Sequence, residues 1–291
     1  MQKFHIVSAL VISVLSAGVR AELVTHYSFD GNALDSSGHG NNAVVHGASL
    51  APDRFGSPNR AYSFDGIDDY ISASASGLPI ADRTVAFWFD ASTFSNHPVM
   101  LGYGGGGCGS GFFIGANATK SIYNDRLYVS SHCDINNLLF HYSTPPIGAW
   151  MHFAMTTSIE GTKMYLNGDL VDSNSTYINN TIVSGKALAI GVDTSPNGSA
   201  PYTDVNVKYY SGIMDDVQIY NTALDAQQIK DLLAVPEPSP EVLVLLGLSM
   251  IGIGARRKSP GACDQHFAQS TPPSTPSSRP SASSSSSSRH L

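Results

Sequence analysis

The chain has 291 residues, of which 42% are hydrophobic and only 13% are charged, so it can bury a sizeable core. Its acids are 19 Asp and four Glu, and its 27 Gly and 13 Tyr favour strands and tight turns over helices. Residues 22–234 hold nine Lys and Arg against twenty Asp and Glu, a formal net charge of −11 that argues against a nucleic-acid partner.

The first 21 residues have the pattern of a secretory signal peptide. Lys3 supplies a positive start, residues 4–17 are mostly apolar, and Ala21 provides a small residue at which cleavage before Glu22 is expected. The alternative is an N-terminal anchor, but the apolar stretch is short for a membrane span. The chain is therefore predicted to be exported.

Period-two alternation recurs along the middle of the chain and predicts short strands. It begins at residues 23–29 and is clear at 85–89, where Val85, Phe87 and Phe89 share one face. Because Trp88 and Trp150 lie in such strands, both are predicted to be in the core. Further strands are expected at 61–65, 69–73, 98–103, 111–115, 126–131, 138–143, 150–157, 162–167, 187–192 and 209–220.

Turn and cap residues divide this pattern into elements. Asn167 and Gly168 predict a two-residue hairpin, because both residues tolerate positive φ. Asp225 with Gln228 three positions later predicts a capping box, and Leu224 with Ile229 a hydrophobic staple, at the start of one short helix. The fold class is therefore all-β, a two-sheet antiparallel β-sandwich or jelly roll with one short C-terminal helix.

The C-terminal end differs from the middle. Residues 235–239 read Val-Pro-Glu-Pro-Ser, an apolar run follows at 242–255, and three cations close the segment at 256–258. Residues 235–258 therefore resemble the PEP-CTERM sorting signal of Gram-negative bacteria. The resemblance implies transient anchoring in the inner membrane, processing by an exosortase and delivery to the cell surface or outside. Residues 259–291 are a low-complexity, disordered tail, which such signals normally lack.

An ordered set of short motifs runs through the middle of the chain. They read Tyr27-Ser-Phe-Asp-Gly31, Phe64-Asp-Gly-Ile-Asp-Asp-Tyr-Ile71, Thr84-Val-Ala-Phe-Trp88, Trp150-Met-His-Phe-Ala154, Tyr165-Leu-Asn-Gly168, Ile190-Gly191 and Gly212-Ile-Met-Asp-Asp-Val-Gln-Ile-Tyr220. Together they resemble the LamG-like jelly roll of the concanavalin A-like lectin/glucanase superfamily. The resemblance assigns residues 22–234 to one such domain and bears on fold more than on function.

The loop at residues 30–42 is dense in side-chain oxygens, which are the ligands that Ca²⁺ prefers. Domains of the resembling family often hold a structural calcium between this loop and the Asp of a later strand. The resemblance therefore implies calcium as a structural cofactor, with Asp30, Asn41 and Asp215 as its ligands. The alternative is that these residues serve turns and caps.

Glycosidase activity is a further possibility, because the superfamily that the chain resembles includes glucanases. It needs two carboxylates facing one cleft, but the Glu-x-Asp-x-x-Glu strand of those enzymes is missing, and Glu22 and Glu160 are the only Glu of the domain. The acid pairs at 68–69 and 215–216 are adjacent, so their side chains are expected on opposite faces of a strand. The chain is accordingly predicted not to be an enzyme.

Two further features belong to the middle region. Cys108 and Cys133 are predicted to form a disulfide in an exported protein, with two free thiols as the alternative. Residues 95–142 combine a Gly-rich loop with several aromatics, among them Tyr103 and Phe112. Because sugars stack on aromatic rings, this region is where a ligand is expected, with no individual residue assigned.

The resulting hypothesis is an exported, non-catalytic module that binds carbohydrate or protein at the cell surface or in an extracellular matrix. Its expected partners are a polysaccharide or surface glycan and an exosortase-type processing enzyme. The alternatives are a purely structural matrix protein and, less favoured, a glycosidase or polysaccharide lyase.

Overall fold

A computed structural model describes residues 21–234, except 96, 106, 108, 118–125, 132–136, 142–144, 176–180 and 205–206. The predicted signal peptide, sorting signal and tail lie outside the described residues, as do Cys108 and Cys133. Within the described part, no helix is both long and apolar enough to cross a membrane.

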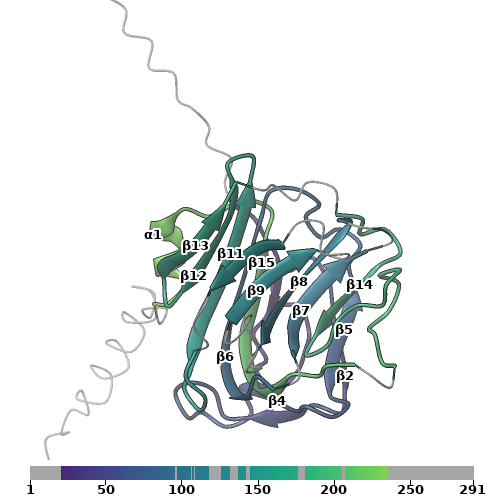
Figure 1. Ribbon diagram of the computed structural model, residues 1–291. Helices are drawn as coiled ribbons and strands as arrows, with labels where there is room; N and C mark the ends of the chain where they lie inside the picture. The colour runs from purple at the N-terminus through teal and green to yellow at the C-terminus, as the bar shows by residue number, and fades with distance from the viewer. Residues whose placement is uncertain are drawn as a thin grey trace, which may run out of the picture. The chain divides into compact units, whose positions relative to one another are not determined.

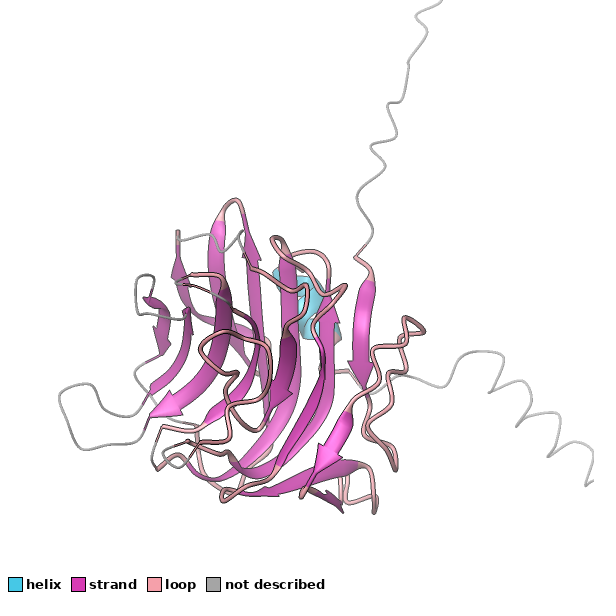
Figure 2. Ribbon diagram, turned by 90° about the vertical axis from the view of Figure 1, so that its right-hand side faces the viewer, coloured by secondary structure: helices cyan, strands magenta, loops and turns pink. Residues whose placement is uncertain are grey.

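The described chain folds into two antiparallel sheets, which confirms the predicted fold class (Figures 1 and 2). We call the larger one sheet A. Its strands, in spatial order, are β13 (Asp169–Asn174), β12 (Gly161–Leu166), β11 (Met151–Ser158), β6 (Arg83–Thr93), β15 (Ser211–Tyr220), β4 (Ala61–Asp65) and β3 (Ser49–Ala51), and β1 (Leu23–Tyr27) also pairs with β15.

The other sheet is called sheet B. Its order is β10 (Asn137–His141), β9 (Arg126–Ser131), β8 (Gly111–Asn117), β7 (Val99–Gly104), β14 (Ala187–Ile190), β5 (Tyr70–Ser74) and β2 (Val44–His46). The three-residue strands β2 and β3 were not predicted, because three residues are too few to show an alternation.

The core lies between the inner faces of the two sheets. Phe87 and Phe89 of β6 project into it from sheet A, and Leu101 and Phe112 project into it from sheet B; all four are fully buried. Alternation along a strand puts every second side chain on this inner face, which is the pattern that the sequence predicted. Trp88 is an exception to the predicted core, because it takes the outer phase of β6 and is only partly buried, as is Trp150.

Local signals determine the turn and the helix. Asn167 and Gly168 both have positive φ, 49° and 81°, and join β12 to β13 as predicted. Helix α1 (Ala226–Asp231) begins with the predicted capping box, in which Asp225 accepts from the backbone of Gln228. The helix lies beside β12 and β13 (Figure 1) and, with Ile229, covers apolar residues on the outer face of sheet A.

One cation is part of the core. Arg83, at the start of β6, is fully buried, and its guanidinium lies 5.0 Å from the ring centroid of Phe112. It donates to the hydroxyl of Thr181 at 2.8 Å and to the carbonyl of Pro79 at 3.3 Å. Arg83 thus joins β6 to the 79–80 segment and to residue 181 across the end of the sandwich.

We expect Arg83→Ala to lower the free energy of unfolding by about 3 kcal/mol, because it leaves a cavity and unpaired buried acceptors. Urea denaturation followed by tryptophan fluorescence measures the loss. The exposed Lys208→Ala is the control and should change stability by less than about 0.5 kcal/mol. Equal effects of the two substitutions would contradict the structural role of Arg83.

Candidate functional site

A bulge in β15 places two carboxylates on the outer face of sheet A. The pairing of β15 with β6 shifts between Asp215 and Gln218, and Asp216 has a φ of +50°. The extra residue turns both acids to the same side. The expectation that Asp215 and Asp216 face opposite ways is therefore wrong, because the strict alternation that it assumed is interrupted at this point.

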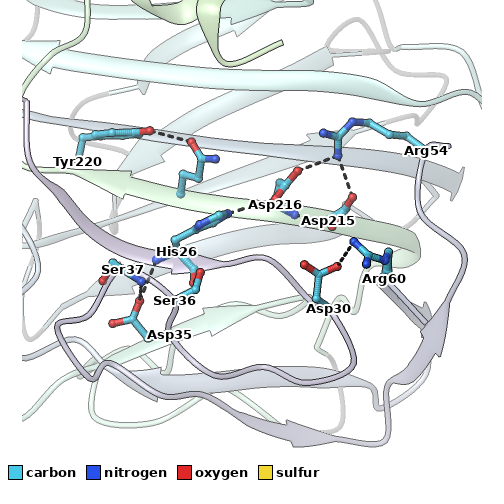
Figure 3. A network of polar contacts seen from close by, with 11 residues as sticks. His26, Asp30, Asp35, Ser36, Ser37, Arg54, Arg60, Asp215, Asp216 and Tyr220 are labelled. Atoms are coloured by element: carbon cyan, nitrogen blue, oxygen red, sulfur yellow. Dashed lines mark hydrogen bonds and ion pairs between the residues drawn. The ribbon is translucent and has the colours of Figure 1, made fainter. Parts of the chain in front are cut away.

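Arg54, from the loop between β3 and β4, lies over both carboxylates (Figure 3). One of its terminal nitrogens donates to Asp215 Oδ2 at 2.9 Å and to Asp216 Oδ2 at 2.7 Å. Its guanidinium also stacks between two rings, 4.6 Å from the centroid of Phe55 and 4.7 Å from that of Trp88. Trp88, on the outer face of sheet A, thus contacts the arginine with its ring.

The surroundings of Asp215 and Asp216 shift the pKa values of the two carboxylates in opposite directions. Burial, followed by the charge of Asp216, raises the pKa of Asp215 to about 7, although Arg54 acts against this shift. Although burial opposes it, hydrogen bonds from His26 and Arg54 and their charges lower the pKa of Asp216. His26 Nε2 lies 3.1 Å from Asp216 Oδ1 and so ties β1 to the bulge.

His152 lies next to this cluster on β11, opposite Trp88 in the neighbouring strand. Its ring is 5.2 Å from the ring of Trp88, and only 2% of the residue is exposed. Burial, with a smaller contribution from the charge of Arg54, lowers its pKa from 6.5 to about 4. The structure gives its Nδ1 no hydrogen-bond partner. His152 is therefore neutral at physiological pH.

The cluster of Arg54, His26, Asp215 and Asp216 cross-links three segments through the two carboxylates. Both carboxylates are engaged by the same guanidinium, and the side chain of Asp215 is only 4% exposed. Glycoside hydrolysis needs a proton donor and a second carboxylate on the two sides of a bond. This geometry instead suits a structural ion cluster.

The three predicted calcium ligands are not joined to one another by hydrogen bonds. Asp30 pairs with Arg60 at 3.0 Å, and Asp215 pairs with Arg54. The side-chain amide of Asn41 donates to the carbonyl of Val24. Each of the two carboxylates is thus paired with an arginine, which a calcium ion would have to displace.

Asp35 organises the loop that was predicted to bind calcium. Its carboxylate accepts from the backbone N–H groups of His26, Ser37 and Asn41 at 2.9 to 3.0 Å. These hydrogen bonds lower its pKa, even though partial burial acts in the opposite direction. Asp35, one of the side chains with oxygen atoms in residues 30–42, therefore stabilises the loop itself, as the alternative interpretation of the sequence predicts.

The turn between β4 and β5 brings three other acids together. Carboxylate oxygens of Asp65, Asp68 and Asp69 lie within 4.8 Å of one another. The backbone N–H groups of Asp65 and Ile67 donate to Asp69 and Asp65 respectively, at 2.9 and 2.7 Å. The expectation that Asp68 and Asp69 point apart is also wrong, because Asp68 belongs to the turn and not to a strand.

Beside this turn lies a hollow of about 170 Å³. We call it the rim hollow. The residues that line it are Asp65, Gly66, Thr93, Ser95, Val207, Lys208, Tyr209 and Ser211. Burial, followed by the charges of the nearby Tyr70 and Asp68, raises the pKa of Tyr209.

Sequence reasoning placed a ligand within residues 95–142, and Ser95 is the part of that region that reaches the rim hollow. Tyr103 and Phe112, the aromatics cited for that region, are instead fully buried in the core. Lys208 and Tyr209 were missed because they follow no motif. Their only signal was a cation immediately before the strand predicted at 209–220 and a tyrosine at its first position.

A second hollow, of about 270 Å³, lies beside the start of α1. Its lining includes Thr156, Glu160, Lys163 and Asp225, and Lys163 lies 3.7 Å from Glu160. No aromatic side chain lines it. Among the described residues of its lining, a sugar ring would therefore find no aromatic ring on which to stack.

The family model for the concanavalin A-like lectin/glucanases superfamily matches residues 65–230, and the chain belongs to this superfamily. Residues 234–258 match the PEP-CTERM protein-sorting motif, which confirms that resemblance and indicates export and sorting to the cell surface. A search of curated proteins found no significant match.

Several solved structures share the fold. Domain 4 of AbnA, an extracellular arabinanase from Geobacillus stearothermophilus solved with arabinotriose, has a TM-score of 0.57 and 19% identity, covering 73% of this chain and 98% of that one. A botulinum neurotoxin type C structure, described as showing dependence of cell entry on two ganglioside molecules, has a TM-score of 0.51 and 15% identity. A Trypanosoma rangeli sialidase mutant has a TM-score of 0.51 and 13% identity.

The coverage of these structures differs. The toxin match covers 73% of this chain and 50% of the toxin chain. The sialidase match covers 72% of this chain and 32% of the sialidase chain. At these identities the likeness concerns the fold alone.

We expect Arg54→Ala to lower the free energy of unfolding at pH 8 by about 3 kcal/mol, because it leaves two partly buried carboxylates without their cation. Chemical denaturation measures the loss. Arg60→Ala is the matched control: its pair with Asp30 is more than half exposed and should be worth less than about 1 kcal/mol. Equal losses would contradict the role of Arg54.

The lowered pKa of His152 predicts acid sensitivity. The unfolded chain takes up a proton near pH 6.5 and the folded chain only near pH 4, so stability is lost as the pH falls through this window. We expect a loss of about 3 kcal/mol between pH 7 and pH 4 from this group. His152→Gln, which cannot titrate, should remove that part of the pH dependence, and an unchanged profile would refute the assignment.

Proposed function

We propose that this chain is an exported, non-catalytic glycan-binding module of the cell surface or extracellular matrix. The observation that carries the proposal is the rim hollow, which combines a tyrosine, hydroxyl groups and charges of both signs on a lectin-type sandwich. Binding sites of small ligands typically pair such a ring with a few convergent polar groups. Domain 4 of the arabinanase, solved with arabinotriose, provides a precedent for saccharide binding on this fold.

The sorting motif supports the proposed location. The motif at residues 234–258 implies an exosortase-type processing enzyme as a partner. The apolar run within it would anchor the chain transiently in the inner membrane before processing. A glycan-binding domain delivered by this route would meet the polysaccharides outside the cell.

We also propose that calcium can stabilise the domain through Asp30, Asn41 and Asp215. The oxygen density of the 30–42 loop supports this, and the ion pairs of Asp30 and Asp215 act against it. Calcium would have to displace Arg54 and Arg60 from the two carboxylates. Its effect on stability is therefore the test of this part of the proposal.

The test is binding of the purified full chain to a panel of polysaccharides and oligosaccharides, by array and then by calorimetry. We expect saturable binding to at least one neutral glycan, without release of new reducing ends. Absence of binding across the panel would favour a purely structural matrix protein. Release of new ends or of unsaturated products would favour the glycosidase or lyase alternative.

The test for calcium compares the melting temperature of the chain in ~2 mM calcium, which is enough to saturate an extracellular-type site, with its melting temperature in chelator. If calcium binds, the temperature rises, and the double substitution Asp30→Asn and Asp215→Asn removes the rise. A melting temperature that is indifferent to chelator would overturn the calcium proposal and leave glycan binding unaffected.

A further inference from the structure

We propose that the chain binds the ammonium group of an aliphatic amine in the second hollow, the one beside the start of α1. We call it the cap hollow. The amine belongs either to a free polyamine or to a lysine side chain of a polypeptide. Binding there is independent of the proposed glycan binding, because the two hollows share no residue. The residues that carry the proposal are Asp82, Thr156, Glu160, Lys163 and Asp225.

Thr156 belongs to the outer face of sheet A, where the cap hollow lies. Its neighbour in β11, Met155, packs into the core, so the alternation of the strand turns Thr156 outward. Thr156 pairs with Thr84 of β6 on one side and with Lys163 of β12 on the other. Paired residues of adjacent strands project to the same face, so all three side chains project outward.

The segment that follows β15 covers this part of the outer face. The hydroxyl of Thr84 donates to the carbonyl of Thr222 at 2.7 Å and accepts from the N–H of Leu224 at 2.9 Å. These two hydrogen bonds hold the segment against the sheet beside Thr156. Thr156 is therefore only 3% exposed, although it faces outward.

The hydroxyl of Thr156 has no hydrogen-bond partner among the described residues. Its oxygen is not sealed from solvent either, so the small exposed part of this side chain opens into the hollow that it lines. A hydroxyl that is almost buried and makes no hydrogen bond lowers the stability of the fold. A polar ligand in the cap hollow would give Thr156 the partner that the chain does not supply.

The carboxylates around Thr156 offer further acceptors. Asp225 caps α1 through Oδ1 alone, which accepts from two backbone N–H groups of the first turn. Its other carboxylate oxygen has no hydrogen bond within the described chain. Asp82 and Glu160 belong to the same lining, and both are exposed. Because an ionised carboxylate can only accept, this lining favours a ligand that donates.

The spacing of these acids favours an organic cation over a metal ion. In the described part of the chain, three carboxylates come within 4.8 Å of one another only in the turn between β4 and β5. Asp82, Glu160 and Asp225 are thus too far apart to coordinate one ion together. An ammonium group has three N–H donors and no acceptor, so it can bond to the Thr156 hydroxyl and to a carboxylate at once.

The charge of the cap hollow also favours a cation. Its lining holds three carboxylates and one cation, Lys163, which gives 1 − 3 = −2. Lys163 lies 3.7 Å from Glu160, and the two side chains are 40% and 76% exposed. Such an exposed pair is weak, so an ammonium ligand can compete with Lys163 for the acids. The remaining negative charge attracts amines and repels anions.

Calorimetry with the purified full chain tests the proposal. The ligands are cadaverine, as the free amine, and a short peptide with blocked ends and a single lysine. Their uncharged counterparts are pentanediol and the same peptide with its lysine acetylated. We expect saturable binding of at least one amine, weakened by salt, and no binding of the uncharged counterparts. The amine that binds more tightly identifies the source of the ammonium group.

Thr156→Val removes the hydroxyl and keeps the shape of the side chain. We expect it to weaken amine binding about tenfold, because a hydrogen bond to a charged group is lost. The melting temperature of the free protein should stay the same or rise, because no partner is left unpaired. Thr93→Val, at the other end of β6 and outside the lining, is the matched control and should bind amines as the parent does.

Two charge variants test the role of the acids. Asp225→Asn keeps a capping side chain but removes its charge, and should weaken amine binding about fivefold. Asp231→Asn removes the same charge from the same helix outside the lining, and should change binding less than about twofold. Lys163→Met removes the competing cation and should strengthen amine binding about threefold.

Several outcomes would overturn the proposal. Absence of binding by both amines would do so, as would equally tight binding of their uncharged counterparts. Parent-like binding by both Thr156→Val and Asp225→Asn would place the amine elsewhere. A lower melting temperature of Thr156→Val would show that the hydroxyl serves the fold and not a ligand. Failure of glycan binding would leave all of these results unaffected.

Discussion

The structure depends on the burial of two apolar sheet faces against each other. Phe87 and Phe89 from one sheet meet Leu101 and Phe112 from the other, and none of them contacts solvent. Burial of this kind is the main favourable contribution to folding. Because it occupies the whole space between the sheets, polar chemistry is confined to the outer faces and to the ends of the strands. Arg83 is buried at one such strand end, where aromatic rings and hydrogen-bond acceptors surround it.

On the outer face of sheet A, the bulge in β15 has the largest consequences. It turns Asp215 and Asp216 to one side, and a single cation, Arg54, serves both. Burial raises the pKa of Asp215, whereas hydrogen bonds and charges from His26 and Arg54 lower the pKa of Asp216 despite its burial, so the two values move apart. Such a separation is also found in acid–base pairs of enzymes. Here one arginine is hydrogen-bonded to both carboxylates and His26 lies against Asp216, which is why we assign the cluster to structure.

Signals that act over a few residues predicted much of the fold. The alternation along β6, the Asn167–Gly168 turn and the capping box at Asp225 are all in the structure as expected. Each depends on backbone geometry and on neighbours within about four residues, so the sequence shows it directly. The same reasoning went wrong at the Asp215–Asp216 pair, where a bulge and the distant Arg54 loop decide which way the side chains point. It also went wrong at Trp88, which the alternation of β6 puts on the outer face and not in the core.

The sequence by itself determined the fold class, the superfamily, the negative charge of the domain and the sorting motif, since composition, period and short motifs carry that information. Only the tertiary structure decided which charges meet. Arg54 and Asp215 are 161 residues apart along the chain, and no local pattern links them. The rim hollow likewise combines residues from the β4–β5 turn, the end of β6 and the start of β15. Strand order brings those three segments together, and strand order depends on the packing of the whole sandwich.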